Sequence, residues 1–191
     1  MSIGEPVFVE SKYITAMDMG TKNFSFYIEE RLFDNETKKQ VSVPISHELI
    51  RYDLMENKKT KSLIQIHKSL ISLLDKYDIW WKKMDTVLIE KQLSRNPRAI
   101  RLEQTCQVYF LVKYPHIKVI PYSSKFKTDL LNAPEDMTKY QRKKWASKKA
   151  IEILTERGDI DTINKINLLR PKIDDVSDCI LMVETYFIKN K

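Results

Sequence analysis

The spacing of apolar residues changes about a third of the way along the chain, and this change limits the folds that the chain can adopt. Before that point, residues 13–18 form an apolar run that predicts a buried strand, and the segments 23–30 and 45–54 alternate apolar and polar residues with the period of a strand. After it, apolar residues from Leu63 to Tyr77 recur at helical spacing. The short connections between the first three strands predict an antiparallel meander.

Two short and almost entirely apolar segments, at 85–90 and 117–122, follow in the second part of the chain. Segments of this kind are typical of buried parallel strands. We expect one helix at about 97–113 and another over YQRKKWASKKAIEILTERG, closed by Gly158 as a C′ glycine. Residues 159–171 are expected to form a loop, and DDVSDCILMVETYFIK is expected to form the last helix.

This order of elements is that of an α/β domain with an RNase H-like fold. Its mixed five-stranded sheet would have three antiparallel strands and then two parallel ones, flanked by helices. The 191 residues suffice for one domain with a sizeable core, and no repeat or linker divides them. We therefore expect a single domain over 1–191, with residues 1–12 as a flexible N-terminal extension.

The charge balance indicates a polyanionic partner. Thirty-three Lys and Arg residues against 26 Asp and Glu residues give a formal net charge of +7. A basic domain of this size most often binds nucleic acid, although a merely soluble basic protein has the same balance.

The cysteines and the hydropathy pattern indicate a soluble intracellular protein without a membrane partner. Cys106 and Cys179 are isolated, which favours free and buried thiols in a reducing compartment. The first residues do not resemble a secretory signal, and no apolar stretch approaches the ~20 residues of a membrane span.

Four carboxylates stand where the expected fold could bring them together. Asp18 ends the first strand, Glu90 ends the fourth, and Asp175 and Asp178 share one face of the last helix. Crowded carboxylates need a compensating charge, and all-oxygen ligands favour Mg²⁺, with Mn²⁺ as a substitute, over zinc. We expect two such ions, which would bind the attacking and leaving oxygens of a phosphodiester.

Each of these features also has a plainer interpretation. Asp18 could form a turn, Glu90 could lie on the surface, and the aspartates of the last helix could favour its dipole. His67, on an apolar helical face, is expected to pack in the core. Gly20 is expected to let the backbone approach the metal and the phosphate.

The motifs MDMGTKN, VLIEKQ and DDVSD resemble, in this order, the acidic motifs of the RuvC-like Holliday junction resolvases, most closely the type of poxviruses and other large DNA viruses. The resemblance implies a metal-dependent endonuclease that resolves four-way DNA junctions by paired symmetric nicks. It implies that Asp18, Glu90, Asp175 and Asp178 are catalytic metal ligands, with Asp174 as an alternative register. It also implies a viral source and the host cytoplasm as the location.

The resemblance implies three further features. A basic segment before the last helix would supply a catalytic lysine, for which Lys148 is favoured and Lys144 is second. Leu93 occupies the place of a residue that wedges into the junction, although it is smaller than an aromatic residue. The protein would be a homodimer, with helix 97–113 either at the interface or covered by its own core.

Basic residues gather in three clusters that would frame the acidic site and contact DNA phosphates. The predicted DNA-binding residues are Arg95, Arg98, Arg101, Lys125, Lys127, Arg142, Lys143 and Lys149. A solvated surface is the plainer interpretation of each cluster taken alone.

Three other functions remain open at this point. The chain could be a ribonuclease H-like or transposase-like nuclease, or a nucleic-acid-binding domain without activity. DMGTKN also resembles the first phosphate loop of the actin and sugar-kinase ATPases, but the chain is too short for their two domains and lacks their second phosphate loop.

Overall fold

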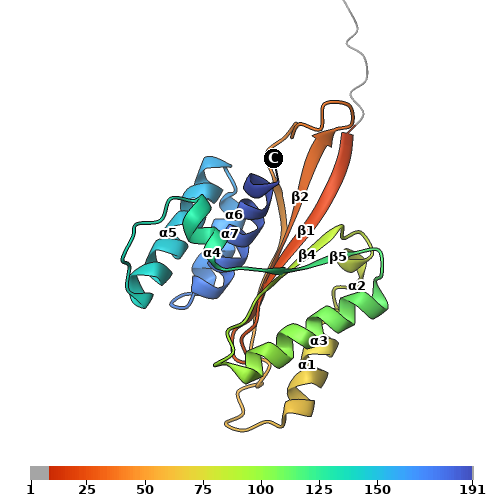
Figure 1. Cartoon of the computed structure of the whole chain (residues 1–191), viewed down its shortest axis with the longest axis vertical. Helices are drawn as coiled ribbons and strands as arrows, with labels where there is room; N and C mark the ends of the chain where they lie inside the picture. The colour runs from red at the N-terminus through yellow and green to blue at the C-terminus, as the bar shows by residue number, and fades with distance from the viewer. Residues whose placement is uncertain (1–8, 191) are drawn as a thin grey trace, which may run out of the picture.

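The structure is a computed structural model that describes residues 9–190. Within this range a twisted sheet of five strands runs between two groups of helices (Figure 1). The strands are β1 (Val9–Asp18), β2 (Phe24–Asp34), β3 (Ile45–Tyr52), β4 (Thr86–Glu90) and β5 (Lys118–Tyr122). The helices are α1 (Leu63–Asp75), α2 (Asp78–Trp81), α3 (Pro97–Lys113), α4 (Lys125–Leu130), α5 (Lys139–Glu156), α6 (Ile160–Leu168) and α7 (Asp174–Lys189).

The sheet has the strand order β3-β2-β1-β4-β5. β1 pairs antiparallel with β2, and β2 pairs antiparallel with β3, whereas β4 is parallel to both β1 and β5. The prediction of an α/β chain with three antiparallel strands followed by two parallel ones is confirmed. Because Met17 pairs with Ile89, the carboxyl ends of β1 and β4 lie side by side.

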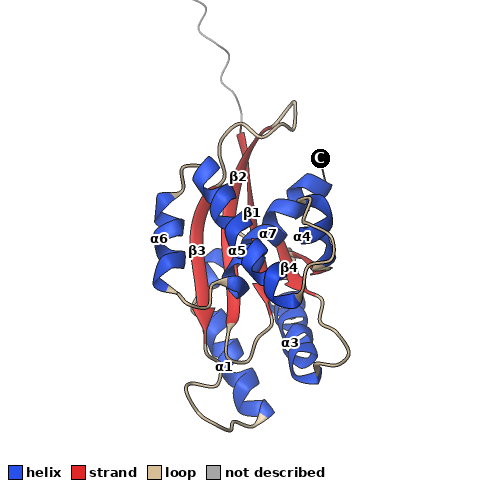
Figure 2. Cartoon of the chain, turned by 90° about the vertical axis from the view of Figure 1, so that its left-hand side faces the viewer, coloured by secondary structure: helices blue, strands red, loops and turns tan. Residues whose placement is uncertain are grey.

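Two apolar clusters cover the two faces of the sheet. Met17 and Ile89 belong to the cluster that includes residues of α1 and α3. Ala16 and Leu88 belong to the opposite cluster, which includes residues of α5 and α7 (Figure 2). Successive residues of a strand point to opposite faces, so the residue after Met17 and the residue after Ile89 both point toward α7.

Local sequence signals explain where the longer helices begin and end. Ser62 with Gln65 forms a capping box at the start of α1, and Thr138 with Gln141 forms another at the start of α5. Gly158, with a φ of 71°, follows the end of α5 and confirms the expected C′ glycine.

The structure corrects three expected boundaries. β1 begins at Val9, so residues 9–12 belong to the strand, and the rest of the expected N-terminal extension lies outside the described residues. Residues 160–168 form α6 instead of a loop. The start of α6 is capped by Asp159, which accepts a hydrogen bond from Thr162 N at 3.0 Å. Ile166 of this helix is fully buried. β2 also continues to Asp34, beyond its predicted end.

Both cysteines are free and buried, as expected. Among residues 9–190, no helix is both long enough and apolar enough to cross a bilayer.

A network of charged side chains is buried between β2, α5 and α7. Arg31 binds Glu29 through Nε at 2.6 Å and Glu184 through Nη2 at 2.6 Å. Arg157, just after α5, binds the other oxygen of Glu29 at 2.6 Å and also binds Glu184. Tyr27 donates a hydrogen bond to Glu29 at 2.9 Å, so every charge of this network has a partner.

The turn between β1 and β2 explains why residue 20 is a glycine. A Cβ atom at Gly20 would lie 2.9 Å from the carbonyl oxygen of Asn23 and 3.0 Å from its carbonyl carbon. The turn's own backbone therefore requires a glycine at this position.

Gly20→Ala should lower the free energy of unfolding by about 1–3 kcal/mol, because the turn has to open to admit the methyl group. Urea unfolding measures the effect. Gly158→Asn is the matched control, since nothing lies within 4 Å of a Cβ there and asparagine tolerates the positive φ. An unfolding curve for Gly20→Ala that overlays the wild-type curve would refute this explanation of the turn.

Candidate active site

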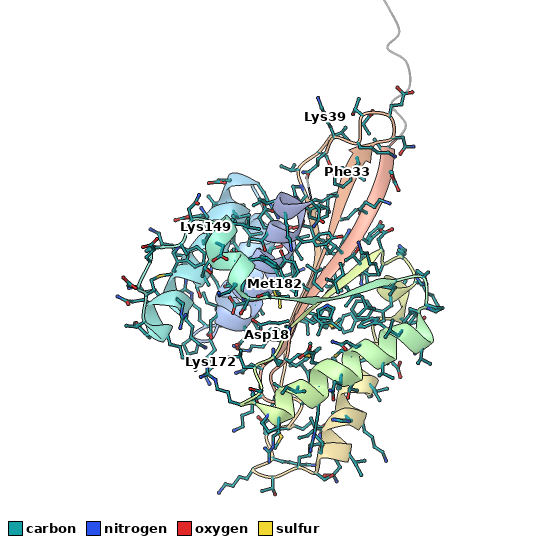
Figure 3. All side chains as sticks on the ribbon, viewed as in Figure 1. Asp18, Phe33, Lys39, Lys149, Lys172 and Met182 are labelled. Carbon is teal, nitrogen blue, oxygen red and sulfur yellow. The ribbon has the colours of Figure 1, made fainter. Side chains whose placement is uncertain are left out.

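Asp18 and Glu90 meet where β1 and β4 end together. The parallel register brings their side chains to the same edge and the same face of the sheet, next to α7. Asp18 lies at the lower end of the sheet in Figure 3. Burial, the charge of Glu90 and a hydrogen bond with Glu90 raise the pKa of Asp18 well above its ordinary value. Burial and the neighbouring charge of Glu90 therefore favour the protonated form of Asp18, which can donate a hydrogen bond to Glu90.

Lys127 links Glu90 to Asp178. Its ammonium lies 3.0 Å from Asp178 Oδ1 and 3.4 Å from Glu90 Oε1, and its side chain is only 7% exposed. Burial alone would lower the pKa of Lys127, but the charges of Asp178, Glu90 and Asp18 outweigh burial and raise it. Lys127 is therefore a buried, charged ammonium among three carboxyl groups.

This ammonium also governs the ionisation of its partners. Burial alone would raise the pKa of Glu90, but the charge of Lys127 and a hydrogen bond with Asp18 lower it. For Asp178, burial and the charge of Glu90 outweigh the attraction of Lys127, and the pKa is raised. Proton sharing and one internal cation thus keep these carboxyl groups together.

The first turns of α7 carry the remaining acidic side chains. Asp175 is partly buried, and its pKa is raised to about 6, first by burial and then by the charges of Asp174 and Asp178. Asp174 forms an ion pair with Lys143 of α5. Asp175 has no ion pair within the described residues. Its carboxyl group, unlike that of Asp174, is therefore not held by a neighbouring cation in an ion pair.

The raised pKa of Asp175 predicts a pH effect on stability. The folded chain holds a proton near pH 5 that the unfolded chain, with an aspartate pKa near 3.8, has released. The contribution of Asp175 to the free energy of unfolding should therefore fall as the pH rises from about 4 to about 6, and Asp175→Asn should remove that part of the slope. Urea unfolding across this range, without metal, measures it.

Asp174→Asn is the control for this effect. It keeps Asp175 but removes a charge that raises its pKa, so the Asp175 midpoint should move down by NMR titration. An Asp175 midpoint near 4 in the wild-type chain would contradict the prediction.

A second layer of residues holds Glu90 in place. Gln92 Nε2 lies 3.2 Å from Glu90 Oε2 and donates a hydrogen bond to it. The backbone N–H of Gln92 donates to Glu103 Oε2 at 2.9 Å, and Glu103, on α3, is nearly buried. Glu103 thus fixes the segment that follows Glu90, and nothing in the sequence pattern singled it out.

The predicted catalytic lysines lie elsewhere. Lys148 has a side chain that is 79% exposed and pairs with Glu152 at 3.6 Å along α5. Lys144 lies on the same exposed side of α5, where both lysines line a groove of about 910 Å³ shared with the segment before α7. Within residues 9–190 neither lysine forms an ion pair with the carboxyl cluster, whose lysine is Lys127.

The other basic residues lie at the surface around this edge. Arg95, Arg98 and Arg101 are exposed in the segment after β4 and in the first turns of α3, and Lys125 is exposed at the start of α4. Arg142 is exposed on α5, Lys143 is held by Asp174, and Lys149 pairs with Glu152 at 3.4 Å. Lys127 departs from the prediction of a DNA-contacting surface residue, because its helix turns it inward to the carboxylates.

The carboxyl groups suit magnesium in their chemistry but do not form a ready-made cage. Among residues 9–190, no three Asp, Glu, His or Cys side chains are arranged to hold a metal ion. The Lys127 ammonium accounts for this, because it bridges Glu90 and Asp178 where a shared cation would bind. The donors are all oxygen atoms, and burial together with the charge of Glu90 raises the pKa values of Asp18 and Asp178.

The chain is similar to two viral proteins. It is 30% identical over 190 residues to the uncharacterized protein 97L of Invertebrate iridescent virus 3, an alignment that covers 96% of this chain and 89% of that protein. The chain belongs to the 97L family. It is also 25% identical over 221 residues to the uncharacterized protein 170L of Invertebrate iridescent virus 6, covering 93% and 89% of the two chains. No family model matches the chain.

For this member of the 97L family, one sequence signal could have found Lys127. β5 is the parallel neighbour of β4, so the segment after β5 begins at the same edge as Glu90. This register places both Lys125 and Lys127 near that edge, and the path of α4 turns Lys127 to the carboxylates. His67 lies partly buried between α1 and α3, with Nδ1 3.4 Å from Thr105 Oγ1.

Proposed function

We propose that the chain is a metal-dependent DNA endonuclease that resolves four-way junctions. The observation that carries the proposal is the gathering of Asp18, Glu90 and Asp178 around the buried Lys127 at one edge of the sheet, with basic residues exposed around it. Carboxylates inside a basic surface suit an enzyme that grips phosphates and holds a divalent cation.

The topology supports an RNase H-like fold for this proposal. The succession of three antiparallel strands and two parallel ones, here in the sheet order β3-β2-β1-β4-β5, agrees with the element order that the sequence predicted for that fold. The carboxylates at the ends of the adjacent strands β1 and β4 and on the last helix also agree with the motif order of the RuvC-like resolvases.

Asp18, Glu90 and Asp178 would hold the metal, with Asp175 as a further ligand. Bound Mg²⁺ would supply a polarised water as nucleophile and charge neutralisation at the departing oxygen. Asp18 would have to be deprotonated to act as a metal ligand. The Lys127 ammonium would move from its position between Glu90 and Asp178 and place its positive charge beside the scissile phosphate.

The surface around the site suits branched DNA. Arg95, Arg98 and Arg101 follow Glu90 directly, so phosphates gripped there would lie next to the carboxylates. Leu93, in the same segment, is 60% exposed and is free to contact unpaired bases at a branch point. The two viral relatives support a viral source for an enzyme of this kind, and we place it in the host cytoplasm.

Incubation with a synthetic four-way junction, a linear duplex and an RNA–DNA hybrid, each with Mg²⁺ and with EDTA, tests the proposal. Paired symmetric nicks in the junction alone, dependent on Mg²⁺, are the expected result. Cleavage of the hybrid alone would favour a ribonuclease H-like enzyme instead. Tight binding of all three without any cleavage would indicate a nucleic-acid-binding domain.

We also propose that the chain acts as a homodimer through α3. The inner face of α3 buries Leu102, Cys106 and Phe110 in the core, while Val108 and Val112 lie on its outer face at 59% and 77% exposure. An apolar stripe on both sides of one helix favours a second packing partner. Two copies related by a two-fold axis would present two sites to the two-fold symmetry of a junction.

Val112→Glu should convert a dimer into a monomer without unfolding the chain, because the side chain is exposed in the single copy. Sedimentation equilibrium measures the change. Lys68→Glu, which adds negative charge at an exposed position of α1, is the control and should leave the dimer intact. A wild-type chain that sediments as a monomer at micromolar concentration would refute the dimer.

A further inference from the structure

A second basic site lies beside the carboxylates. A pocket of about 590 Å³ opens between the β1–β2 turn, the segment after β3 and the segment before α7. Every residue that lines it is polar, and its cationic side chains are Lys22, Arg51, Lys58, Lys59 and Lys172. Asp53 is its one acidic lining residue. A pocket whose lining side chains are polar and mostly cationic suits an anion.

The pocket belongs to the same edge of the sheet as Asp18. The β1–β2 turn follows Asp18 directly, and the end of β3 pairs with the start of β2 through Tyr52 and Phe24. The labels of Lys172 and Asp18 both stand near the lower end of the sheet in the view of Figure 3.

The segments that form the pocket are held in place by contacts of their own. The carboxylate of Asp53 accepts hydrogen bonds from the backbone N–H groups of Met55 at 2.8 Å and Asn57 at 3.0 Å. The Asp53 carboxylate therefore stabilises the turn that carries Lys58. Arg51 donates hydrogen bonds to the carbonyl of Leu169 at 2.9 Å and to the carbonyl of Lys172. These bonds fix the segment before α7, which forms one side of the pocket.

The cations of the pocket are not neutralised by the chain. Within residues 9–190, none of the pocket's five cationic side chains forms an ion pair with a carboxylate at 4.0 Å or less. These side chains are Lys22, Arg51, Lys58, Lys59 and Lys172. The nearby Glu56 is held by Lys61 at 2.9 Å and by Ser69 at 2.7 Å. Unpaired cations on anchored segments form a site for an anion from outside.

We propose that this pocket binds one backbone phosphate of the DNA strand that enters the carboxylate site. This inference rests on the proposed function, since the adjoining site is what selects a nucleic-acid phosphate over other anions. The strand would then run from the carboxylates past the β1–β2 turn toward the end of β3. That path leads away from Arg95, Arg98 and Arg101, because β2 and β3 lie on one side of β1 and β4 lies on the other.

Binding of a short oligothymidylate to the full-length chain in EDTA tests the pocket without requiring cleavage. NMR should show shifts of the amide signals of Asn23, Asn57 and Lys172. The variant Lys58→Gln/Lys172→Gln should bind roughly tenfold more weakly. Its plot of log affinity against log salt should be shallower by about 0.7, the value for one lost contact on a single strand.

Lys39→Gln/Lys76→Gln is the matched control, because it removes the same charge at exposed positions outside the pocket; Lys39 lies at the far end of the β2–β3 hairpin in Figure 3. Equal affinity and salt dependence of the wild type and the pocket variant would overturn the inference, even if the wild type cuts junctions. Inorganic phosphate that shifts the same signals when the oligonucleotide does not would overturn the assignment to a strand. Absence of cleavage with pocket binding intact would refute the proposed function alone.

Discussion

Asp18→Asn is expected to slow cleavage of a four-way junction by on the order of 10³-fold or more, while junction binding stays within a few-fold of the wild type. Asp18 stands where β1 and β4 end together, and its carboxylate would hold the metal. Asparagine keeps the size of the side chain and can still donate a hydrogen bond to Glu90, so the fold is retained. Single-turnover cleavage with Mg²⁺ and binding in EDTA measure the two effects separately.

Asp129→Asn is the control for Asp18→Asn. Asp129 is an exposed carboxylate of α4, two residues from Lys127, and it makes no ion pair in the part of the chain described. Its amide should cut at the wild-type rate. Cleavage at the wild-type rate by Asp18→Asn would refute the assignment of Asp18 as a metal ligand, independently of the result for Asp129→Asn.

Arg157→Met is expected to lower the free energy of unfolding by about 3–5 kcal/mol, the cost of breaking a buried ion pair from one side. The substitution leaves Glu29, which is fully buried, with one of its two arginine partners. It also removes a partner of Glu184 and so weakens the joint between β2 and α7. Urea unfolding at neutral pH, where both glutamates would be charged in water, measures the loss.

Two further variants separate this network from a general effect of losing an arginine. Arg142→Met removes an exposed arginine from α5 and should change the unfolding free energy by less than about 0.5 kcal/mol. Glu29→Met together with Arg157→Met should cost less than the sum of the single changes, because the pair leaves together. An Arg157→Met chain as stable as the Arg142→Met chain would mean that the network adds nothing to stability.

The fold was predictable where periodicity reports burial directly. The alternation in β2 and the apolar run of β4 identify strands whose faces are covered, and the switch to helical spacing at α1 is unambiguous. α6 was not predictable as a helix from periodicity, because only two of its residues are buried and its stability depends on the Asp159 cap and on contacts with the sheet. The extension of β1 to Val9 likewise depends on pairing with β2, which the local sequence does not reveal.

The acidic half of the candidate site was predictable because strand ends are places that a sequence can specify. Asp18 and Glu90 close two strands, and parallel pairing makes those ends neighbours. The place of Lys127 among the carboxylates was not predicted, because the resemblance to the resolvases implied a lysine from the basic segment before the last helix and so favoured Lys148. Only the three-dimensional path after β5 separates a lysine that turns inward from those that face solvent, and that path depends on packing between α4 and α7.

Lys127 has a consequence for the way the proposed enzyme would be loaded. An ammonium tethered by its own side chain competes for Glu90 and Asp178 at an effective concentration that the surrounding solution does not alter. We therefore expect the DNA-free chain to remain folded when divalent ions are scarce and to retain them weakly. An arriving phosphate would attract the ammonium away from the carboxylates and vacate a place for the ion. Binding of the DNA substrate would thus permit binding of the metal ion that cleavage requires. The DNA-free protein would not cut DNA that it contacts only briefly.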